Sequence, residues 1–237
     1  LGLRTLLVEK HDFAWGTSSR SSKLVHGGLR YLKERKVRLT RASVHERERL
    51  LDEGPGLIDP LGFLLATYEG DRPGRWTYSA GLSVYDLLAL QWSHRRYSSE
   101  DFQMLAPHIS QPGLKGGFRY GDAQTDDARL VLSLIRESVM DGGLALNYAR
   151  ADSLMLTRSG QVCGVGIRDT AGGTERTAEL RAKVVVNATG AWADTLRAQI
   201  APETRGRIMP KNRLRPLRGS HLVLPLERLP ITRSVSF

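Results

Sequence analysis

The sequence predicts an α/β fold, and two observations carry that prediction. Short apolar runs suited to strands alternate along the chain with segments whose apolar residues recur at helical spacing. Hydrophobic residues make up 41% of the 237 residues, which is enough for a sizeable core and excludes a disordered chain. The length fits one large domain or two small ones.

The first third of the chain begins with a strand and ends with a helix. A buried parallel strand is expected over residues 4–9, because an apolar run there ends in an acid. A stretch rich in Ser, Thr and Gly follows over 16–28. A helix is expected over 37–51, since Pro55 and Gly56 then interrupt its apolar spacing.

The middle of the chain continues the alternation. Residues 63–68 are expected to form a strand and 76–92 an amphipathic helix. A short strand over 117–120 is expected to run into an acidic turn, Gly121-Asp122. Asp126 and Asp127 are then expected to open a helix that Gly142-Gly143 stops, because acids in a first turn complement the helix dipole.

The last third is expected to be rich in strands. The predicted strands cover 144–148, 151–157, 161–168, 174–180, 183–187 and 222–224. Ala171-Gly172-Gly173 predicts a hairpin between the third and fourth of these strands. A helix is expected over 192–200.

The charge of +10 is concentrated at the two ends of the chain. Residues 1–50 hold 12 basic and 5 acidic side chains, and residues 196–237 hold 9 and 2. Basic ends suit a nucleic acid, a small anionic ligand or an anionic membrane surface. No recognised nucleic-acid module accompanies the charge, so no nucleic-acid partner is expected, although a basic nucleic-acid-binding protein stays an alternative.

The single cysteine limits the chemistry further. Cys163 alone excludes a disulfide framework and a multi-thiolate metal site, and no metal is expected. No run of 18 apolar residues is present in the sequence, so no membrane-spanning helix is expected.

Four stretches carry chemistry, and the first is the strand that ends at Glu9. An acid at this place in a dinucleotide-binding βαβ unit accepts hydrogen bonds from the adenosine ribose. That role requires a glycine-rich loop roughly 20 residues upstream. Only eight residues precede Glu9, so an ordinary acid at a strand end is the alternative.

The second stretch covers residues 16–31 and resembles a cradle for an anion. Hydroxyls and backbone N–H groups in a tight segment suit pyrophosphate oxygens, and Gly27 and Gly28 let a flat ring or an anion approach the backbone. The alternative is an exposed Ser-rich linker. Binding is favoured because Lys23, His26 and Arg30 are spaced among the small residues.

The third and fourth stretches lie near the end of the chain. Over 184–194 a β-branched run meets small residues and then a helix start, as where a backbone approaches a dinucleotide or, equally, at an ordinary turn. Over 213–221 arginines and His221 cluster. They would hold a phosphate group or accept a proton, unless they form a solvated surface segment.

Together these stretches resemble the FAD-dependent glycerol-3-phosphate dehydrogenase family. Residues Thr17–Tyr31 resemble its signature T-S-S-x-S-x-K-L-[IV]-H-G-G-L-R-Y almost without change. The segment Gly121–Leu130 is similar to its G-D-x-x-x-D-D-A-R-L element, Asn187–Trp192 to N-A-T-G-x-W and Gly219–His221 to the end of K-G-S-H.

The resemblance implies a fold and an activity. The fold would be a partial Rossmann-like FAD-binding domain with an antiparallel-sheet substrate domain, as in glycine-oxidase-like flavoproteins. The FAD-binding domain would cover 1–62 and 115–200, and the substrate domain 63–114 and 201–237. The enzyme would oxidise sn-glycerol 3-phosphate to dihydroxyacetone phosphate and pass electrons to quinone. The alternative within enzymes is a glycerol-3-phosphate oxidase or a related amine oxidase.

The resemblance also implies site residues. Arg30 would face the substrate, and His221 would be the base that removes the hydroxyl proton. Glu9 would bind the adenosine ribose and Ala151 would lie near the adenine. The pyrophosphate and flavin would be lined by residues of the second and third stretches, namely Thr17, Ser18, Ser19, Ser22, Lys23, Leu24, His26, Gly27, Ala188, Thr189, Gly190 and Trp192.

The sequence departs from the family at several points. The opening G-x-G-x-x-G and the later half of the family pattern are absent, so an internal fragment is expected that binds FAD poorly and turns over little substrate. Trp15 replaces a small residue, and Arg218 replaces a lysine. The family further implies a cytoplasmic protein, peripherally associated with the inner face of the plasma membrane, with a homodimer left open.

Overall fold

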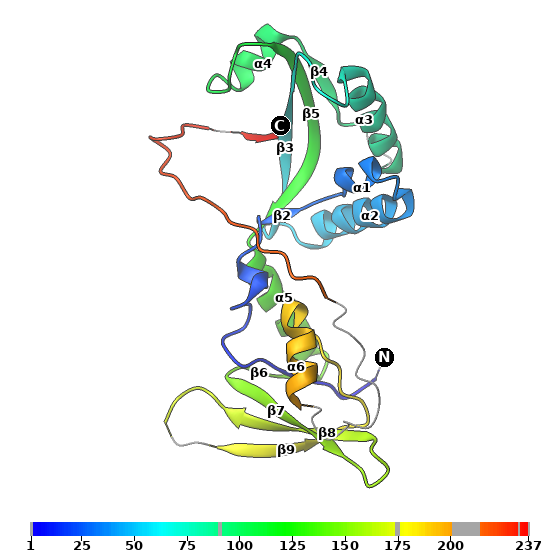
Figure 1. Ribbon diagram of the computed structural model, residues 1–237, viewed down its shortest axis with the longest axis vertical. Coiled ribbons are helices and arrows are strands. Elements are labelled where there is room, and N and C mark those ends of the chain that lie inside the picture. Colours follow the sequence, from blue (N-terminus) through cyan, green and yellow to red (C-terminus); the bar gives the residue numbers. More distant parts are fainter. Residues whose placement is uncertain (1, 90–91, 174–175, 201–213, 232, 237) are drawn as a thin grey trace. The chain divides into compact units, whose positions relative to one another are not determined.

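A computed structural model describes residues 2–89, 92–173, 176–200, 214–231 and 233–236 (Figure 1). Contacts divide the chain into two compact units. Unit 1 consists of Leu1–Ser21 and Asp127–Ser220, and unit 2 of Ser22–Asp126 and His221–Phe237. These boundaries follow contacts within the chain, and the division into cofactor and substrate domains expected above stays a prediction.

Unit 2 is built on one mixed sheet. Its strands lie in the order β10 (Ser234–Ser236), β3 (Ile58–Tyr68), β5 (Leu114–Thr125) and β2 (Leu24–Val25), while β4 (Arg95–Tyr97) pairs with β5. The long strands β3 and β5 are antiparallel over nearly their whole length, and they form the tall ribbon of Figure 1. Among the described strands of this sheet, β10 alone runs parallel to its neighbour.

Strand β5 differs from its prediction. A short strand over 117–120 and a turn at Gly121-Asp122 were expected, but β5 continues through both residues to Thr125. The turn prediction was wrong because the Asp122 carboxylate is buried and receives hydrogen bonds from His26 and Gly27. A buried acid in the middle of a strand is tolerated when partners of this kind satisfy it.

Both faces of this sheet are covered. The helices α1 (Leu29–Lys33), α2 (Val37–Glu53) and α3 (Arg75–Ala89) belong to one side, where the buried cluster contains Phe63, Leu65, Leu82, Phe118 and Tyr120. The helix α4 (Ser99–Leu105) belongs to the other side, where Phe102 packs with Leu64, Ala66, Ala106 and Leu114. Along β3 the two clusters follow the alternation of side chains, which places neighbouring residues on opposite faces. Leu114 of β5 lies beyond a register shift, at Tyr68.

The helices α2 and α3 confirm the periodic spacing in the sequence. Helix α2 covers the whole expected range. Helix α3 ends at Ala89, so Trp92 lies beyond it and is exposed, and residues 90–91 lie outside the described part of the chain. The short elements α1, α4, β2, β4 and β10 had no clear signal, because a few residues do not show a period.

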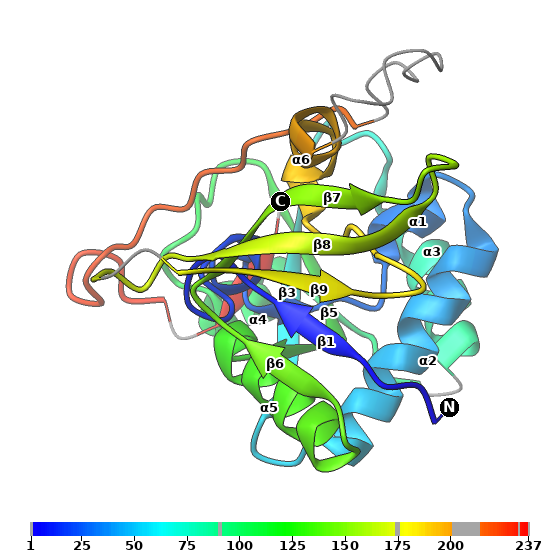
Figure 2. The ribbon, with the colours of Figure 1, turned by 90° about the horizontal axis from the view of Figure 1, so that it is seen from below.

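The described part of unit 1 contains two α-helices and two small sheets (Figure 2). Strand β1 (Leu6–Val8) pairs in parallel with β6 (Leu144–Leu146), and α5 (Asp127–Met140) precedes β6 in the chain. The other sheet is antiparallel and has the order β7 (Ala149–Leu156), β8 (Val162–Asp169) and β9 (Thr177–Arg181). The predicted hairpin is therefore confirmed, while residues 174–175 of its expected second strand lie outside the described part.

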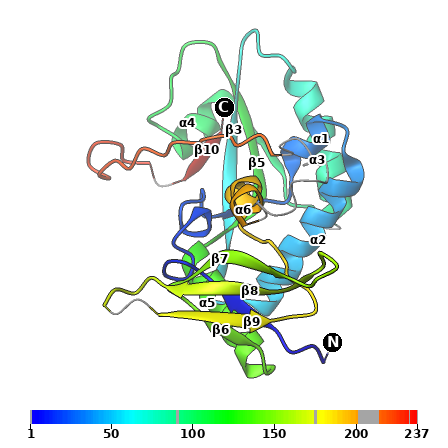
Figure 3. The ribbon, with the colours of Figure 1, turned by 60° about the horizontal axis from the view of Figure 1, so that its bottom comes forward.

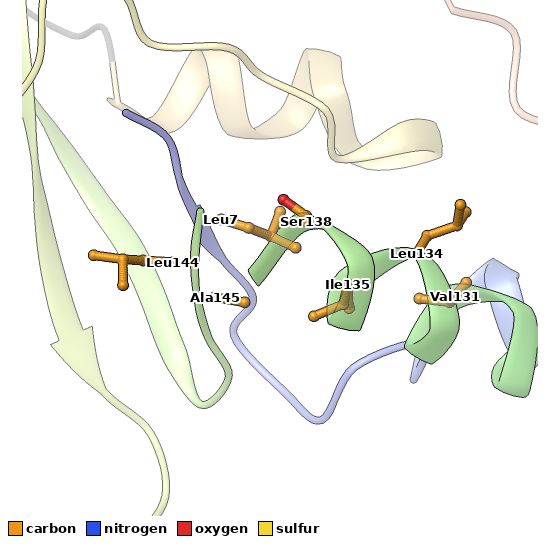
Figure 4. Close-up of a pocket in the computed structure, with 7 residues that line it drawn as sticks. All are labelled: Leu7, Val131, Leu134, Ile135, Ser138, Leu144 and Ala145. Atoms are coloured by element: carbon orange, nitrogen blue, oxygen red, sulfur yellow. The ribbon is translucent and has the colours of Figure 1, made fainter. Parts of the chain in front are cut away.

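The remaining helices of unit 1 follow the second sheet in sequence. A 3-10 turn, η2 (Gly190–Trp192), leads into α6 (Ala193–Ile200), which lies beside β7 (Figure 3). An apolar hollow of about 260 Å³ lies between helix α5 and the strands β1 and β6 (Figure 4). Its lining residues are Leu7, Val131, Leu134, Ile135, Ser138, Leu144 and Ala145.

Two predicted strands are wrong. Residues 183–187 form no strand, and Val184 and Val186 are 74% and 78% exposed. Residues 222–224 also form no strand and are largely exposed. A β-branched run forms a strand only where a neighbouring chain takes up its backbone hydrogen bonds, and neither segment finds such a partner among the described residues.

Candidate functional site

Glu9 lies directly after β1, at the carboxyl end of a parallel strand. Its backbone N–H donates to the Leu146 carbonyl at 2.9 Å, and its own carbonyl accepts from Ala149 at 2.8 Å. Its carboxylate oxygen Oε1 accepts the N–H of His11 at 3.0 Å. The half-buried side chain thus has a defined position at the edge where the sequence predicted a ribose-binding acid.

The second stretch begins with a 3-10 turn, η1 (Thr17–Ser19), in which Thr17 and Ser18 are exposed. The stretch is attached to α5 through Ser21, whose N–H and hydroxyl both donate to Asp127 at 3.1 and 2.7 Å. Asp127 is buried in the first turn of α5. Asp127 was expected to stabilise the start of the helix. It also has a second role that was not expected, because it holds the second stretch through Ser21.

Two tryptophans flank the start of this stretch. A Cβ added to Gly16 would lie 3.5 Å from the Trp192 ring, and the Arg20 guanidinium lies 4.8 Å from the centre of the Trp15 ring. Arg20 also donates to the Gly16 carbonyl at 3.0 Å. Unit 1 therefore brings the beginning of the second stretch next to the Trp192 end of the third.

In the third stretch, the space beside the Gly190 backbone is free of other protein atoms among the described residues. Gly190 has φ +56°, and an added Cβ would meet nothing within 4 Å. The N–H and hydroxyl of Thr189 donate to Asn187 Oδ1, which fixes the turn before it. Ala188 is exposed, and Ala151 lies half-buried in β7. The backbone near Gly190 thus leaves room for the close approach of a ligand.

The rest of the signature belongs to unit 2. Lys23 has φ +58°, and Leu24 pairs with Gln124 in the antiparallel pair of β2 and β5. The His26 ring binds Asp122 through Nδ1 at 2.7 Å, and the Gly27 N–H donates to the other carboxylate oxygen at 3.0 Å. The hydrogen bond to Asp122 raises the pKa of His26 above its ordinary value, and partial burial opposes that rise.

A buried cation supports this pair from α2. Arg47 Nη1 lies 3.5 Å from Asp122 Oδ1, donates to the Tyr85 hydroxyl at 2.7 Å and to the Gly121 carbonyl at 3.0 Å. Burial raises the pKa of the Tyr85 hydroxyl, which keeps it neutral beside these charges. Asp122 appeared in the sequence only as part of a motif, and Arg47 had no signal of any kind.

The two residues expected to be catalytic, Arg30 and His221, both lie in unit 2. Arg30 lies in α1, but its side chain is outside the described part of the structure. His221 and Ser22 are exposed residues of unit 2, and His221 lies in an extended segment without regular structure. Arg213, at the start of the fourth stretch, lies outside the described residues.

The sequence matches the family model of the FAD dependent oxidoreductases (DAO) over residues 1–236. It is 38% identical over 239 residues to the aerobic glycerol-3-phosphate dehydrogenase of Bacillus subtilis (strain 168), covering 100% of this chain and 41% of that protein. The enzyme of the same name from Staphylococcus aureus (strain MRSA252) is 36% identical, again over 100% of this chain and 42% of the relative. The chain thus spans about two fifths of these relatives.

Solved structures agree. The glycerol-3-phosphate dehydrogenase of Bacillus halodurans complexed with FAD is 33% identical with a TM-score of 0.60, over 84% of this chain and 32% of that one. The glycine oxidase of Bacillus cereus ATCC 14579 shares the fold at 18% identity and a TM-score of 0.57, over 83% and 53%. A match of the family model to nearly every residue settles the classification, and the chain belongs to the FAD dependent oxidoreductase family.

Proposed function

We propose that the protein containing these residues oxidises sn-glycerol 3-phosphate at C2 to dihydroxyacetone phosphate with FAD as its cofactor. The observation that carries this proposal is the 38% identity to an aerobic glycerol-3-phosphate dehydrogenase over the whole of this chain. Relatives of the amine-oxidase kind share the fold at much lower identity, so they support the flavoprotein class and not the substrate.

The residues of unit 1 fit the adenosine and pyrophosphate parts of FAD. Glu9 presents a carboxylate at a strand end, Thr17 and Ser18 present exposed hydroxyls, and Gly190 leaves its backbone open. Carboxylates suit ribose hydroxyls, while hydroxyl and backbone N–H groups suit phosphate oxygens. We assign Ala151, Ser19, Ala188, Thr189 and Trp192 to the same group of cofactor contacts.

Residues of unit 2 would contact the flavin end and the substrate. Bound FAD supplies the acceptor for the hydride that leaves C2. Lys23, Leu24, His26 and Gly27 are assigned to the flavin, where a cation such as Lys23 favours the negative charge of its reduced form. Arg30 would bind the substrate, and His221 would take the hydroxyl proton as a neutral imidazole.

Quinone as the electron acceptor, contact with the inner face of the plasma membrane and a homodimer also belong to the proposal. The word "aerobic" in the names of the relatives supports the respiratory role. Among the described residues, no helix combines the length and the apolar character needed to cross a membrane. Membrane contact would therefore use basic surface residues or other parts of the protein.

The test is anaerobic reduction of the bound flavin. We expect sn-glycerol 3-phosphate to bleach the visible flavin absorbance and to yield dihydroxyacetone phosphate, whereas glycerol, which lacks the phosphate, does not. Reoxidation by a soluble quinone without peroxide supports a dehydrogenase, while stoichiometric peroxide in air identifies an oxidase. Bleaching by glycine or sarcosine alone refutes the proposed substrate. A salt-dependent shift of duplex DNA without flavin binding would favour the nucleic-acid alternative.

A further inference from the structure

The hydrogen bond of His26 determines which ring nitrogen carries a proton. Nδ1 lies 2.7 Å from Asp122 Oδ2, and an ionised carboxylate only accepts hydrogen bonds. The neutral ring must therefore carry its hydrogen on Nδ1, which leaves the lone pair on Nε2. The His26 side chain is 52% exposed, and no other hydrogen bond of its ring is present among the described residues, so Nε2 has no partner there.

Asp122 is held in one orientation from the opposite side. Its Oδ1 accepts the Gly27 N–H at 3.0 Å and lies 3.5 Å from Arg47 Nη1. The side chains of Asp122 and Arg47 are only 3% and 5% exposed. The Tyr85 hydroxyl and the Gly121 carbonyl fix Arg47 in turn. The carboxylate cannot rotate without losing several of these contacts, so it holds the His26 ring in a fixed position.

A second pair in the same unit shows what a purely structural contact looks like. His94 Nδ1 lies 2.6 Å from Asp86 Oδ2, and the same oxygen accepts the backbone N–H groups of Ser93 and His94. Asp86 therefore binds the backbone of the nearby residues Ser93 and His94, and the His94 side chain is only 11% exposed. In contrast, Asp122 binds a histidine 96 positions away in the sequence, and the His26 side chain is 52% exposed.

We propose that Asp122 is a positioning residue that fixes His26 as its Nδ1–H tautomer and so presents Nε2 as a hydrogen-bond acceptor. The ligand that Nε2 would face rests on the proposed function, because His26 is assigned there to the flavin. The charged groups that act on the ring come from two elements, namely Asp122 of β5 and, through it, Arg47 of α2. The Phe63 ring of β3, centred 6.1 Å from the His26 ring, adds no charge.

The first experiment reads the tautomer by long-range ¹H–¹⁵N spectra of the six histidines, with His26→Gln used to assign the signal. We expect the neutral His26 ring of the unmodified chain to show an Nδ1–H tautomer. A neutral Nε2–H form would overturn the proposal. This measurement needs neither FAD nor substrate, so failure of glycerol 3-phosphate oxidation leaves its outcome unchanged.

The second experiment removes the carboxylate. In Asp122→Asn we expect the His26 midpoint to fall and its tautomer to change, while the matched control Asp86→Asn changes the His94 signals alone. An unchanged His26 signal in Asp122→Asn overturns the proposal. If this variant does not fold, the tautomer of the unmodified chain still decides.

The third experiment measures the loaded enzyme. We expect Asp122→Asn to lower kcat roughly tenfold to hundredfold with a smaller change in KM, and to move the acid limb of the pH profile to lower pH. Asp122→Glu should recover part of kcat, and Asp86→Asn should leave kcat and the pH limb unchanged. A loss of folded protein without any movement of the pH limb would contradict the positioning role.

Discussion

Gly27 occupies a place where a methyl group has no room. A Cβ built on it would overlap the Tyr85 hydroxyl, and would lie 2.7 Å from Arg47 Nη1 and 2.9 Å from Tyr85 Cζ. Tyr85 is 1% exposed, and its hydroxyl accepts the hydrogen bond from Arg47 at 2.7 Å. The substitution Gly27→Ala therefore forces a buried tyrosine away from a buried cation.

The cost follows from two contributions. The Tyr85 ring would retreat by at least about 0.5 Å, the gap between 2.9 Å and the 3.4 Å at which ordinary contact begins. Overpacking of this kind costs about 1–3 kcal/mol, and a lost hydrogen bond from a charged donor costs about 1.5–3 kcal/mol. We expect a loss of about 3 kcal/mol or more, which for a chain of this size lowers Tm on the order of 10 °C.

Urea and thermal unfolding, followed by tryptophan fluorescence and circular dichroism, measure this loss. Adding Tyr85→Phe to Gly27→Ala removes the atom that clashes most, so the double variant should recover about half of the lost stability. Gly81→Ala is the matched control, because an added Cβ there meets nothing within 4 Å and alanine suits helix α3 better by about 0.5–1 kcal/mol. A Gly27→Ala variant as stable as the unmodified chain, or no rescue by Tyr85→Phe, would refute the reasoning.

Three further predictions concern a cap, a titration and local stability. Ser98→Ala removes the hydroxyl that accepts the Asp101 N–H at 3.1 Å at the start of α4, and urea unfolding should show a loss of about 1 kcal/mol. The raised pKa of His26 means that its bond to Asp122 stabilises the fold fully below the ordinary value of 6.5 and less as pH rises through the folded pKa. The difference in unfolding free energy between the unmodified chain and Asp122→Asn should therefore shrink from pH 6 to about pH 9, and a growing difference would contradict this. Hydrogen exchange should be slowest in β3 and β5, which contribute to two buried clusters, and fast in the two-stranded pair of β1 and β6.

Local signals in the sequence predicted local structure well. The apolar spacing of α2 and α5 and the glycines after β8 act within a few residues, so they could be recognised without knowledge of the fold. The run at 183–187 shows the limit of this reasoning. Its β-branched residues indicate a strand, but a strand also needs a neighbour, and the sequence does not say whether one is within reach.

The same distinction between local and distant signals applies to the residues of the candidate site. The hydroxyls, His26 and Gly27 could be recognised because they are consecutive in one motif. The partner of His26 is 96 residues away, and Arg47 looks like one more exposed helical arginine until the structure shows its 5% exposure. Only the pairing of distant strands reveals which charges become buried together.

That pairing also explains the spacing within the two longest motifs. Strand β2 is antiparallel to β5 with Leu24 opposite Gln124 and Val25 opposite Ala123. Counting on by the same sum of residue numbers, His26 corresponds to Asp122 and Ser21 to Asp127. Both of these pairs are joined by hydrogen bonds, at 2.7 Å in each case. The spacing of five positions from Ser21 to His26 therefore equals the spacing of five positions from Asp122 to Asp127. A shift of β2 against β5 by one residue would turn its side chains to the other face and separate His26 from Asp122, so the two motifs constrain each other through this register.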